Sequence, residues 1–530
     1  MDEDGLARDL QFFAHETPRR GAGSPDEAKA FRYAERELRA AGWDVAFESL
    51  ETLCSTVRET SVEVEGGPTL PAMGIGYATD RGAGRFLDLV DAGDGGVDAY
   101  GGVDAAAKAV LVASGGPAVP DKAFLAHRRG AVALLLISPA SPAPTLALRA
   151  QKGLWGPPQP EDLLDLPDVT AVSVAHEDGL RLKAFLRERG RVRVRLQHAA
   201  EVAWRPLRQL VARLGPEDGE FLLLHGHLDA WSPGVTDNAT GCAALLAAAR
   251  ALAAGPPLPR AVWLALWTGH EVEEASGSAA FVDRHWADLR RCVLHLNVDS
   301  PGCVGGERIL LYRSLELRTR ARQGLGPLVG ALAAELPLSK ESDNSFALAG
   351  VPGVGVVPAG ERGRTPEGHD IPPLWWMHTG RDTMEWVDRD LLVRDAEFLL
   401  HLTRSFALAP AVHDFAPVAD LLEHVLRDLA DDGLLALWPA AGRALGSGAS
   451  GERARALSRL LLATIGTRGG RLRHDRYGDP LYAYEYPGIA HLLGATAEEH
   501  ALRAARLRER NRLDDLLRAL RRLEGSPDGP

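Results

Sequence analysis

Uninterrupted apolar segments recur in the middle of the chain and predict the strands of a buried sheet. Residues 221–224, 261–267 and 292–298 are almost wholly apolar and have the length of strands. The alanine- and leucine-rich segment 241–252 lies between the first two and predicts a helix. Apolar strands that alternate with helices are typical of a sheet covered on both faces. The pattern therefore predicts an α/β fold here.

The flanking segments show other patterns. A helix is predicted over residues 25–41, where Ser24 and Glu27 have the spacing of a capping box. Residues 55–200 contain short apolar or alternating segments between Pro- and Gly-rich turns, which predicts a small mixed α/β unit. Beyond residue 410, apolar residues recur at helical spacing, which predicts helices with one buried face.

The chain is long enough to form several domains. At roughly 150 residues per domain, 530 residues correspond to three or four units. We expect residues 1–54 and 201–410 to form one α/β domain. Residues 55–200 would be inserted into it, and residues 411–530 would form a helical C-terminal domain.

Charge and composition exclude several classes of protein. A formal net charge of −12 argues weakly against nucleic acid as a partner, because its phosphates need a basic surface. No apolar run reaches the roughly 18 residues that a membrane span needs, and the acidic first residues lack an apolar signal region. We therefore expect a cytoplasmic protein that binds neither nucleic acid nor membranes. The 4 cysteines show no CxxC spacing and are expected to be buried apolar residues.

Imidazole and carboxylate side chains stand at the ends of the predicted strands and in two nearby turns. These residues are His227, Asp229, Asp237, Glu271, Asp299 and His378. Ligands of α/β sheets gather beyond the carboxyl ends of the strands, and these side chains are the ligands that zinc and similar divalent ions prefer. Because His227 and Asp229 are two residues apart, we expect the Asp229 carboxylate to accept the second ring N–H of His227.

These motifs, taken in order, resemble the co-catalytic zinc aminopeptidase and glutamate carboxypeptidase family of metallopeptidases. The resemblance covers roughly residues 20–410. Its motifs are His227-Leu-Asp229, Asp237-Asn238-Ala239-Thr240-Gly241, Gly269-His270-Glu271 with Gly277-Ser278, Asn297-Val298-Asp299, Ser342-Asp343-Asn344-Ser345-Phe346 and His378-Thr379 with Asp382-Thr383. The resemblance implies a three-layer α/β/α zinc-exopeptidase-like catalytic domain. Residues 55–200 are similar to the protease-associated (PA) domain often inserted in this family.

By position, the resemblance implies two divalent metal ions, most often zinc. His227, Asp237 and Asp299 would bind one ion, and Asp237, Glu271 and His378 would bind the other. Asp237 would bridge the pair. Such a site activates a water shared by both metals toward a peptide or amide carbonyl. The implied activity is a metal-dependent hydrolase of the aminopeptidase or dipeptidase kind.

One position departs from the family pattern. The family has two adjacent glutamates, a general base followed by a ligand, and the first position here is His270. Four interpretations stay open: His270 is the base, since imidazole accepts a proton near neutral pH; His270 is a metal ligand; Glu273 or Glu274 is the base; or hydrolysis has been lost. Asp229 and His270 are the candidate catalytic residues beside the five metal ligands.

Two other functions are weighed against the hydrolase. One is a non-catalytic or repurposed relative that acts as a binding or scaffold protein, and the other is a transferase resembling glutaminyl cyclase. For the hydrolase, the expected substrate is a peptide or an N-acyl or aminoacyl small molecule. Recognition of a substrate carboxylate would need a cation, and the candidates are Arg313, Arg362, Arg364 and Arg381. By analogy with larger family members, the C-terminal helices suggest a homodimer.

Overall fold

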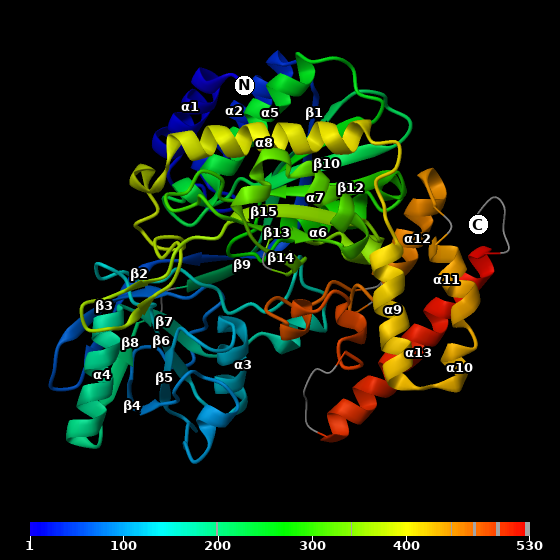
Figure 1. The fold of residues 1–530 in the computed structure, drawn as a ribbon. Coiled ribbons are helices and arrows are strands. Elements are labelled where there is room, and N and C mark those ends of the chain that lie inside the picture. The colour runs from blue at the N-terminus through cyan, green and yellow to red at the C-terminus, as the bar shows by residue number, and fades with distance from the viewer. Residues whose placement is uncertain (198–199, 341, 447, 470–472, 494–498, 525–530) are drawn as a thin grey trace.

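The largest element of the fold is a sheet of eight strands. The computed structural model describes residues 1–197, 200–340, 342–446, 448–469, 473–493 and 499–524. Strand order in the sheet is β1-β9-β11-β10-β12-β15-β13-β14 (Figure 1). The strands span β1 Asp44–Val57, β9 Ala200–Leu214, β10 Phe221–His227, β11 Ala261–Trp267, β12 Cys292–Val298, β13 Ile309–Arg313, β14 Leu332–Pro337 and β15 Gly353–Pro358.

The three predicted apolar strands lie side by side at the centre of this sheet. Strand β10 pairs in parallel with β11 on one side and with β12 on the other. Every residue of the three strands is buried, as continuous apolar strands predict. Strand β10 continues three residues beyond the predicted end at Leu224, because His225, Gly226 and His227 also pair with β11. Their carboxyl ends therefore meet at one edge.

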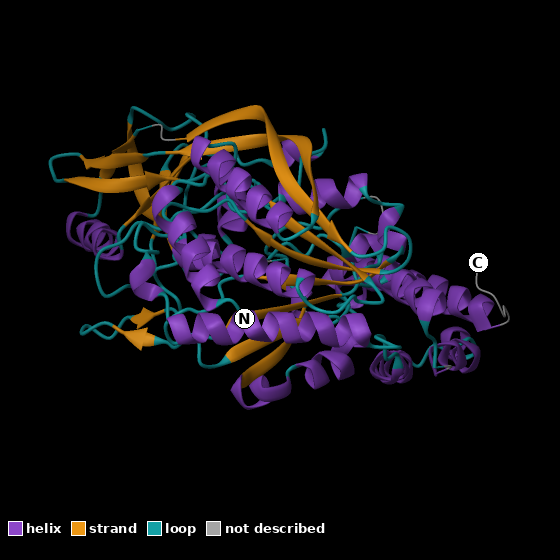
Figure 2. Cartoon of the chain, turned by 90° about the horizontal axis from the view of Figure 1, so that it is seen from above, coloured by secondary structure: helices purple, strands orange, loops and turns teal. Residues whose placement is uncertain are grey.

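Helices cover both faces of the sheet, which confirms the three-layer α/β/α prediction. On one face, five helices share a hydrophobic core with Leu222 and Leu224: α1 Glu3–Gln11, α2 Pro25–Ala40, α5 Thr240–Ala253, α7 Arg318–Gly324 and α8 Arg389–Leu408. On the other face, α6 (Ser276–Arg284) packs with Phe221 and Leu223. Successive residues of β10 thus point into opposite cores. Figure 2 shows helices on both sides of the strands.

Residues 59–196 form a second unit, a closed barrel that the sequence analysis did not predict. Its strand order is β2-β3-β7-β6-β5-β4-β8. The strands span β2 Glu59–Val64, β3 Thr69–Gly74, β4 Phe86–Asp91, β5 Ala109–Ala113, β6 Ala133–Ile137, β7 Thr170–Val174 and β8 Arg193–Leu196. Helices α3 (Val119–Arg128) and α4 (His176–Arg189) accompany it. Closure joins β2 to β8, which are far apart in sequence.

Two long strands link the sheet to the barrel along the chain. Strands β1 and β9 pair antiparallel from Asp44 and Arg213 to Val57 and Ala200. Both strands carry many polar residues, so no apolar run marks them in the sequence. Each crosses a predicted segment boundary, at 54 and at 200. The division into four segments stays a prediction.

The C-terminal part is helical and has its own core. Its helices are α9 Ala416–Leu429, α10 Asp432–Leu435, α11 Trp438–Gly446, α12 Gly451–Thr464 and α13 Glu499–Glu524 (Figures 1 and 2). Leu422, Leu457 and Leu516 belong to this core, which also includes Leu315 from the α/β unit. A minor two-stranded sheet, β16 (Gly363–Arg364) and β17 (Asp370–Ile371), precedes His378. Within the described residues, no helix is both long and apolar enough for a membrane span.

Candidate metal centre

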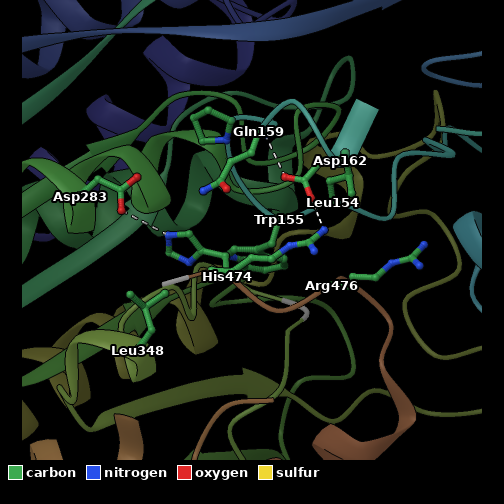
Figure 3. Close-up of a pocket in the computed structure, with 10 residues that line it drawn as sticks. Leu154, Trp155, Gln159, Asp162, Asp283, Leu348, His474 and Arg476 are labelled. Atoms are coloured by element: carbon green, nitrogen blue, oxygen red, sulfur yellow. Dashed lines mark hydrogen bonds and ion pairs between the residues drawn. The ribbon is translucent and has the colours of Figure 1, made fainter. Parts of the chain in front are cut away.

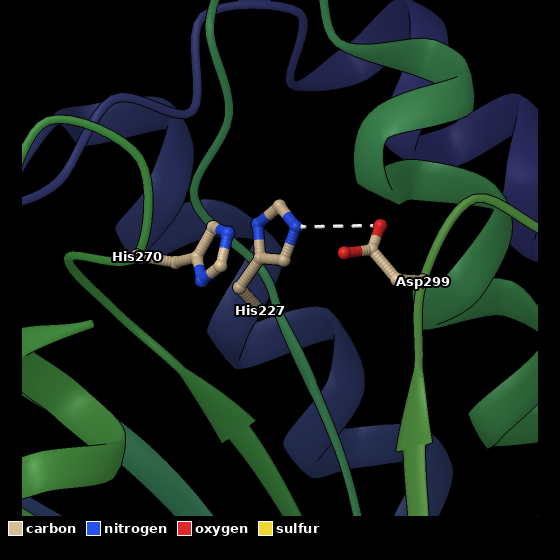
Figure 4. Close-up of side chains that lie close together, drawn as sticks. All are labelled: His227, His270 and Asp299. Atoms are coloured by element: carbon tan, nitrogen blue, oxygen red, sulfur yellow. Dashed lines mark ion pairs between the residues drawn. The ribbon is translucent and has the colours of Figure 1, made fainter. Parts of the chain in front are cut away.

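His227, the last residue of β10, faces two carboxylates. Its Nε2 lies 3.1 Å from Asp237 Oδ1. The same nitrogen lies 3.8 Å from Asp299 Oδ1 (Figure 4). Asp299 follows β12, the strand next to β10, while Asp237 stands in the turn before α5. The parallel strands thus bring these groups together, as the sequence predicted.

A second histidine approaches Asp237 from the opposite side. His378 Nε2 lies 2.9 Å from Asp237 Oδ2 and 3.3 Å from Glu271 Oε2. Glu271 follows β11 and is buried, whereas the His378 side chain is 36% exposed and forms the open side of the cluster. All five predicted ligands therefore converge, and Asp237 stands between the two histidines.

Asp229 has a different role from the one predicted. The ring Nδ1 of His227 lies 2.9 Å from the backbone carbonyl of Asp229, not from its carboxylate. The carboxylate instead accepts the backbone N–H groups of His270 and Glu271, each at 3.0 Å. Asp229 does lie beside His227, as the spacing predicted. Its backbone oxygen, rather than its carboxylate, faces the His227 ring. Asp229 thus positions the segment that follows β11.

The same contact determines which nitrogen of His227 faces the cluster. A carbonyl oxygen only accepts hydrogen bonds, so Nδ1 carries a proton and Nε2 is the nitrogen that faces the carboxylates. Nε2 is buried and makes no hydrogen bond with any residue that the structure describes. A buried ring nitrogen directed at two carboxylates binds a cation there, either a proton or a metal ion in its place.

The charges of the cluster also favour a bound cation. Burial, together with the nearby carboxylate of Asp237, raises the pKa of Glu271 well above its ordinary value. Burial opposes protonation of His227, but the carboxylates of Asp237 and Asp299 outweigh it and raise the pKa of that imidazole well above its usual range. Closely packed carboxylates repel one another, and a divalent cation would relieve this repulsion.

Two further residues hold the turn that carries Asp237, and the sequence analysis assigned them no role. Asp382 accepts the backbone N–H of Thr236 at 2.8 Å, the Thr236 hydroxyl at 2.7 Å and the backbone N–H of Asp237 at 3.0 Å. Asn238 donates to the carbonyl of Val298 at 2.9 Å and accepts the backbone N–H of Ser300 at 3.1 Å. These bonds tie the Asp237 turn to the residues around Asp299 and His378.

His270 lies against the cluster. Its ring stacks on that of His227 with 3.9 Å between centroids, and one of its nitrogens lies within 4.8 Å of ligand atoms of His227 and Asp299 (Figure 4). Its Nδ1 lies 3.1 Å from Oδ2 of Asp343, a carboxylate with no exposed surface. In the sequence, Asp343 stands out only as part of a motif. Its pairing with His270 could not be found from the sequence, because the two residues are far apart in the chain.

Glu273 and Glu274, the other candidate bases, are not part of the metal-binding cluster. The Glu273 carboxylate accepts the backbone N–H of Ser55 at 3.1 Å, and burial raises its pKa to about 8. Among the described residues, neither Glu273 nor Glu274 belongs to a group of side chains that could hold a metal.

His225 is part of the core, as its position deep in β10 suggested. Trp267 Nε1 donates to His225 Nδ1 at 3.0 Å, and His225 Nε2 lies 3.0 Å from His295 Nδ1. Burial lowers the pKa of His225 to about 4, so the ring is neutral. Trp267, His225 and His295 thus form a chain of hydrogen bonds within the core.

A cleft of about 790 Å³ opens beside the cluster, between the sheet and the barrel. Residues from both units line it, among them Ser55, Leu148, Trp231, Val272, Glu273 and Arg381. Leu148, from the segment between β6 and β7, also donates its backbone N–H to the carbonyl of His378 at 2.8 Å. The inserted segment therefore forms one wall of the access to the metal centre.

The arginines proposed to bind a substrate carboxylate lie in different parts of the structure. Arg381 lines this cleft, whereas Arg313 is buried and makes two hydrogen bonds to Glu485. Arg364 pairs with Asp370 on the exposed β16–β17 ribbon. Of the four candidates, Arg381 alone lines the cleft, and Arg362 lies exposed outside it.

A smaller pocket of about 60 Å³ lies where the inserted segment, α6 and the C-terminal part meet (Figure 3). Trp155, Asp283 and His474 line it, and His474 Nε2 lies 3.8 Å from Asp283 Oδ1. The pocket has room for a few water molecules. None of the predicted site residues lines it.

Comparisons with known proteins agree with this geometry. Residues 209–403, which include all five predicted ligands, match the model of peptidase family M28. Endoplasmic reticulum metallopeptidase 1 from Rattus norvegicus is 36% identical over 113 residues, which make up 20% of this chain and 12% of that protein. The mouse protein of the same name is 34% identical over the same length, again 12% of the relative. The chain therefore matches only a small part of these curated relatives.

Solved structures share the fold at low sequence identity. An aminopeptidase from Aneurinibacillus sp. strain AM-1 is 20% identical, with a TM-score of 0.59 over 77% of this chain and 94% of that one. A zinc aminopeptidase from Bacillus subtilis is 18% identical, with a TM-score of 0.58 over 77% and 95%. A peptidase M28 precursor from Shewanella amazonensis is 17% identical, with a TM-score of 0.61 over 77% and 94%. The predicted resemblance is confirmed over residues 209–403, which match peptidase family M28, and the fold is that of the solved zinc aminopeptidases.

Proposed function

We propose that this protein is a zinc-dependent hydrolase of peptide or amide bonds, of the aminopeptidase or dipeptidase kind. The observation that carries the proposal is the convergence of two imidazoles and three carboxylates at one edge of the sheet, within the segment that matches the peptidase family. A lone histidine or carboxylate at a strand end would support no such conclusion. Five together form the ligand set of a hydrolytic metal site.

The resemblance to the peptidase family assigns the five residues to two sets. His227, Asp237 and Asp299 would hold one zinc ion, and Asp237, Glu271 and His378 would hold the second. When bound, the two ions would lower the pKa of a shared water and polarise the carbonyl of the substrate. Three protein ligands for each ion leave a position open, which is the arrangement of catalytic rather than structural zinc.

His270 would act as the general base. Both sets of ligands would be complete without it, and its ring stacks on His227 within 4.8 Å of a ligand atom of Asp299. The ring would accept the proton that the attacking water loses as its oxygen bonds to the carbonyl carbon. It would return this proton to the amine nitrogen when the C–N bond breaks. Asp229 would support this step by holding the backbone of His270 and Glu271 in place.

The substrate would bind in the cleft between the sheet and the barrel. A volume of about 790 Å³ is within the range of small-molecule sites and suits a short peptide or an N-acyl or aminoacyl compound. Arg381 is placed to bind a substrate carboxylate, and Glu273 lies in the wall of the same cleft.

Metal analysis combined with an activity screen tests this function. The protein should be loaded with zinc, freed of excess metal, and assayed against aminoacyl, N-acyl-amino-acid and dipeptide substrates. We expect about two zinc ions per chain and hydrolysis of at least one class. Glu271→Ala should abolish turnover, while Glu316→Gln, which changes a buried carboxylate outside the site, should not. Retention of less than one zinc per chain would contradict the proposal.

The alternative function is a non-catalytic binding or scaffold protein built on the same fold. The observation that favours it is the histidine at the position of the family's general base. Two bound zinc ions with no hydrolysis across the whole substrate panel would support this alternative.

A further inference from the structure

Asp343 is a buried carboxylate that faces the ring of His270. Its side chain has no exposed surface, and Oδ2 lies 3.1 Å from His270 Nδ1. The contact has the distance of an ion pair, and neither carboxylate oxygen accepts a hydrogen bond from the residues that the structure describes. A buried carboxylate is costly unless it is paired, so this contact requires an explanation.

The position of the pair relative to the metal centre suggests that explanation. The His270 ring is held on one face by His227, at 3.9 Å between centroids, and at one edge by Asp343. Its backbone is held by the Asp229 carboxylate. The ring is therefore restrained on three sides, while its 12% exposed surface leaves the remaining edge toward solvent.

We propose that Asp343 is a positioning residue that holds the tautomer and the orientation of His270. The ionised carboxylate can only accept, so Nδ1 carries the proton and Nε2 carries the lone pair. This inference rests on the proposed function for its catalytic consequence. A peptidase that has histidine in place of a carboxylate base needs such a partner, because an imidazole has two nitrogens and either one can carry the proton.

The proton balance of the step explains why a carboxylate is suited to this position. When Nε2 takes the proton from water, His270 becomes an imidazolium with protons on both nitrogens. The negative charge of Asp343 stabilises this cation until the proton passes to the leaving amine. No redox change or additional reactant is involved.

A double-mutant cycle on the zinc-loaded protein tests the inference. Asp343→Asn should lower kcat by about 10- to 100-fold with little change in KM or zinc content, as expected for a partner that acts through another side chain. In a His270→Gln background, the same change should cost less than about twofold. Glu316→Gln serves as the matched control, because it neutralises a fully buried carboxylate outside the site. Equal losses from Asp343→Asn in both backgrounds would overturn the inference.

A second measurement does not depend on activity. Nitrogen NMR of the protein labelled with ¹⁵N-histidine reports which ring nitrogen carries the proton, and the His270 signals are identified by their loss in His270→Gln. We expect the Nδ1–H tautomer in the unmodified protein and a changed pattern in Asp343→Asn. An Nε2–H tautomer in the unmodified protein would refute the role of Asp343. Absence of hydrolysis with the expected tautomer would contradict only the proposed function.

Discussion

His227 and His378 approach opposite oxygens of Asp237. The Nε2 atoms of the two rings lie 3.1 Å from Oδ1 and 2.9 Å from Oδ2. One histidine ends a central strand and the other stands in a turn about 150 residues later, so only the folded chain makes Asp237 the shared group. This geometry makes Asp237 the residue on which both proposed metal positions depend.

Replacing Asp237 should therefore affect both ions at once. Asp237→Asn keeps the shape of the side chain but removes its charge, and we expect zinc content to fall below one ion per chain. Hydrolysis should fall by more than about 100-fold, since loss even of residues that only orient ligands costs 10- to 100-fold. Zinc measured by mass spectrometry, beside the Glu316→Gln control, checks this. A variant that retained two zinc ions would show that Asp237 is not a shared ligand.

Asp382 should support the metal centre without binding metal. Asp382→Asn replaces an oxygen that accepts from Thr236 or Asp237 with a donor, which leaves a buried N–H unpaired. We expect a loss of about 1–3 kcal/mol in the free energy of unfolding. Zinc affinity should fall by about 10- to 100-fold. Urea unfolding and zinc titration with a competing chelator measure the two effects. An unchanged zinc affinity would limit Asp382 to a purely structural role.

His225 should be important for stability and not for metal binding. His225→Ala leaves Trp267 Nε1 and His295 Nδ1 without partners, and each unsatisfied buried group costs about 1–3 kcal/mol. A cavity adds to this loss. Urea unfolding of the metal-free protein measures it, and the zinc content of the folded protein provides the control. If zinc were lost while stability remained unchanged, the structural role of His225 would be wrong.

Glu316 should make stability depend on pH. Burial raises its pKa to about 7, from an ordinary value near 4.5 in the unfolded chain. Between these values the folded protein binds more protons than the unfolded chain, so Glu316 lowers stability as pH rises from 4.5 to 7. Above pH 7 its cost stays constant at about 3 kcal/mol.

The neutral variant Glu316→Gln isolates this effect, provided that its amide oxygen still accepts from Ser458. We expect the variant to gain stability over the unmodified protein at pH 8 and to show no gain near pH 4.5. Urea unfolding of both proteins at the two pH values gives the comparison. A difference in stability that does not change with pH would contradict the raised pKa.

Some features of this protein follow from its sequence alone. The buried strands β10, β11 and β12 were predicted because their apolar runs have the length of strands and lack a polar face. Because such strands are parallel, the residues after them had to meet at one edge, so His227, Glu271 and Asp299 could be grouped before any coordinates. Asp237, before the following helix, and His378, in a later polar turn, completed the group. The resemblance to the peptidase family then assigned the five residues to two ions.

Other features were decided only by the tertiary structure. The closed barrel depends on pairing between β2 and β8, and the long strands β1 and β9 have no apolar run to mark them. The roles of Asp229, Asp343 and Asp382 depend on which atom of each residue faces a neighbour. Sequence spacing determines which face of a strand a residue occupies. The direction of a side chain and the partner of each donor depend on how distant segments pack together, and no local pattern encodes that arrangement.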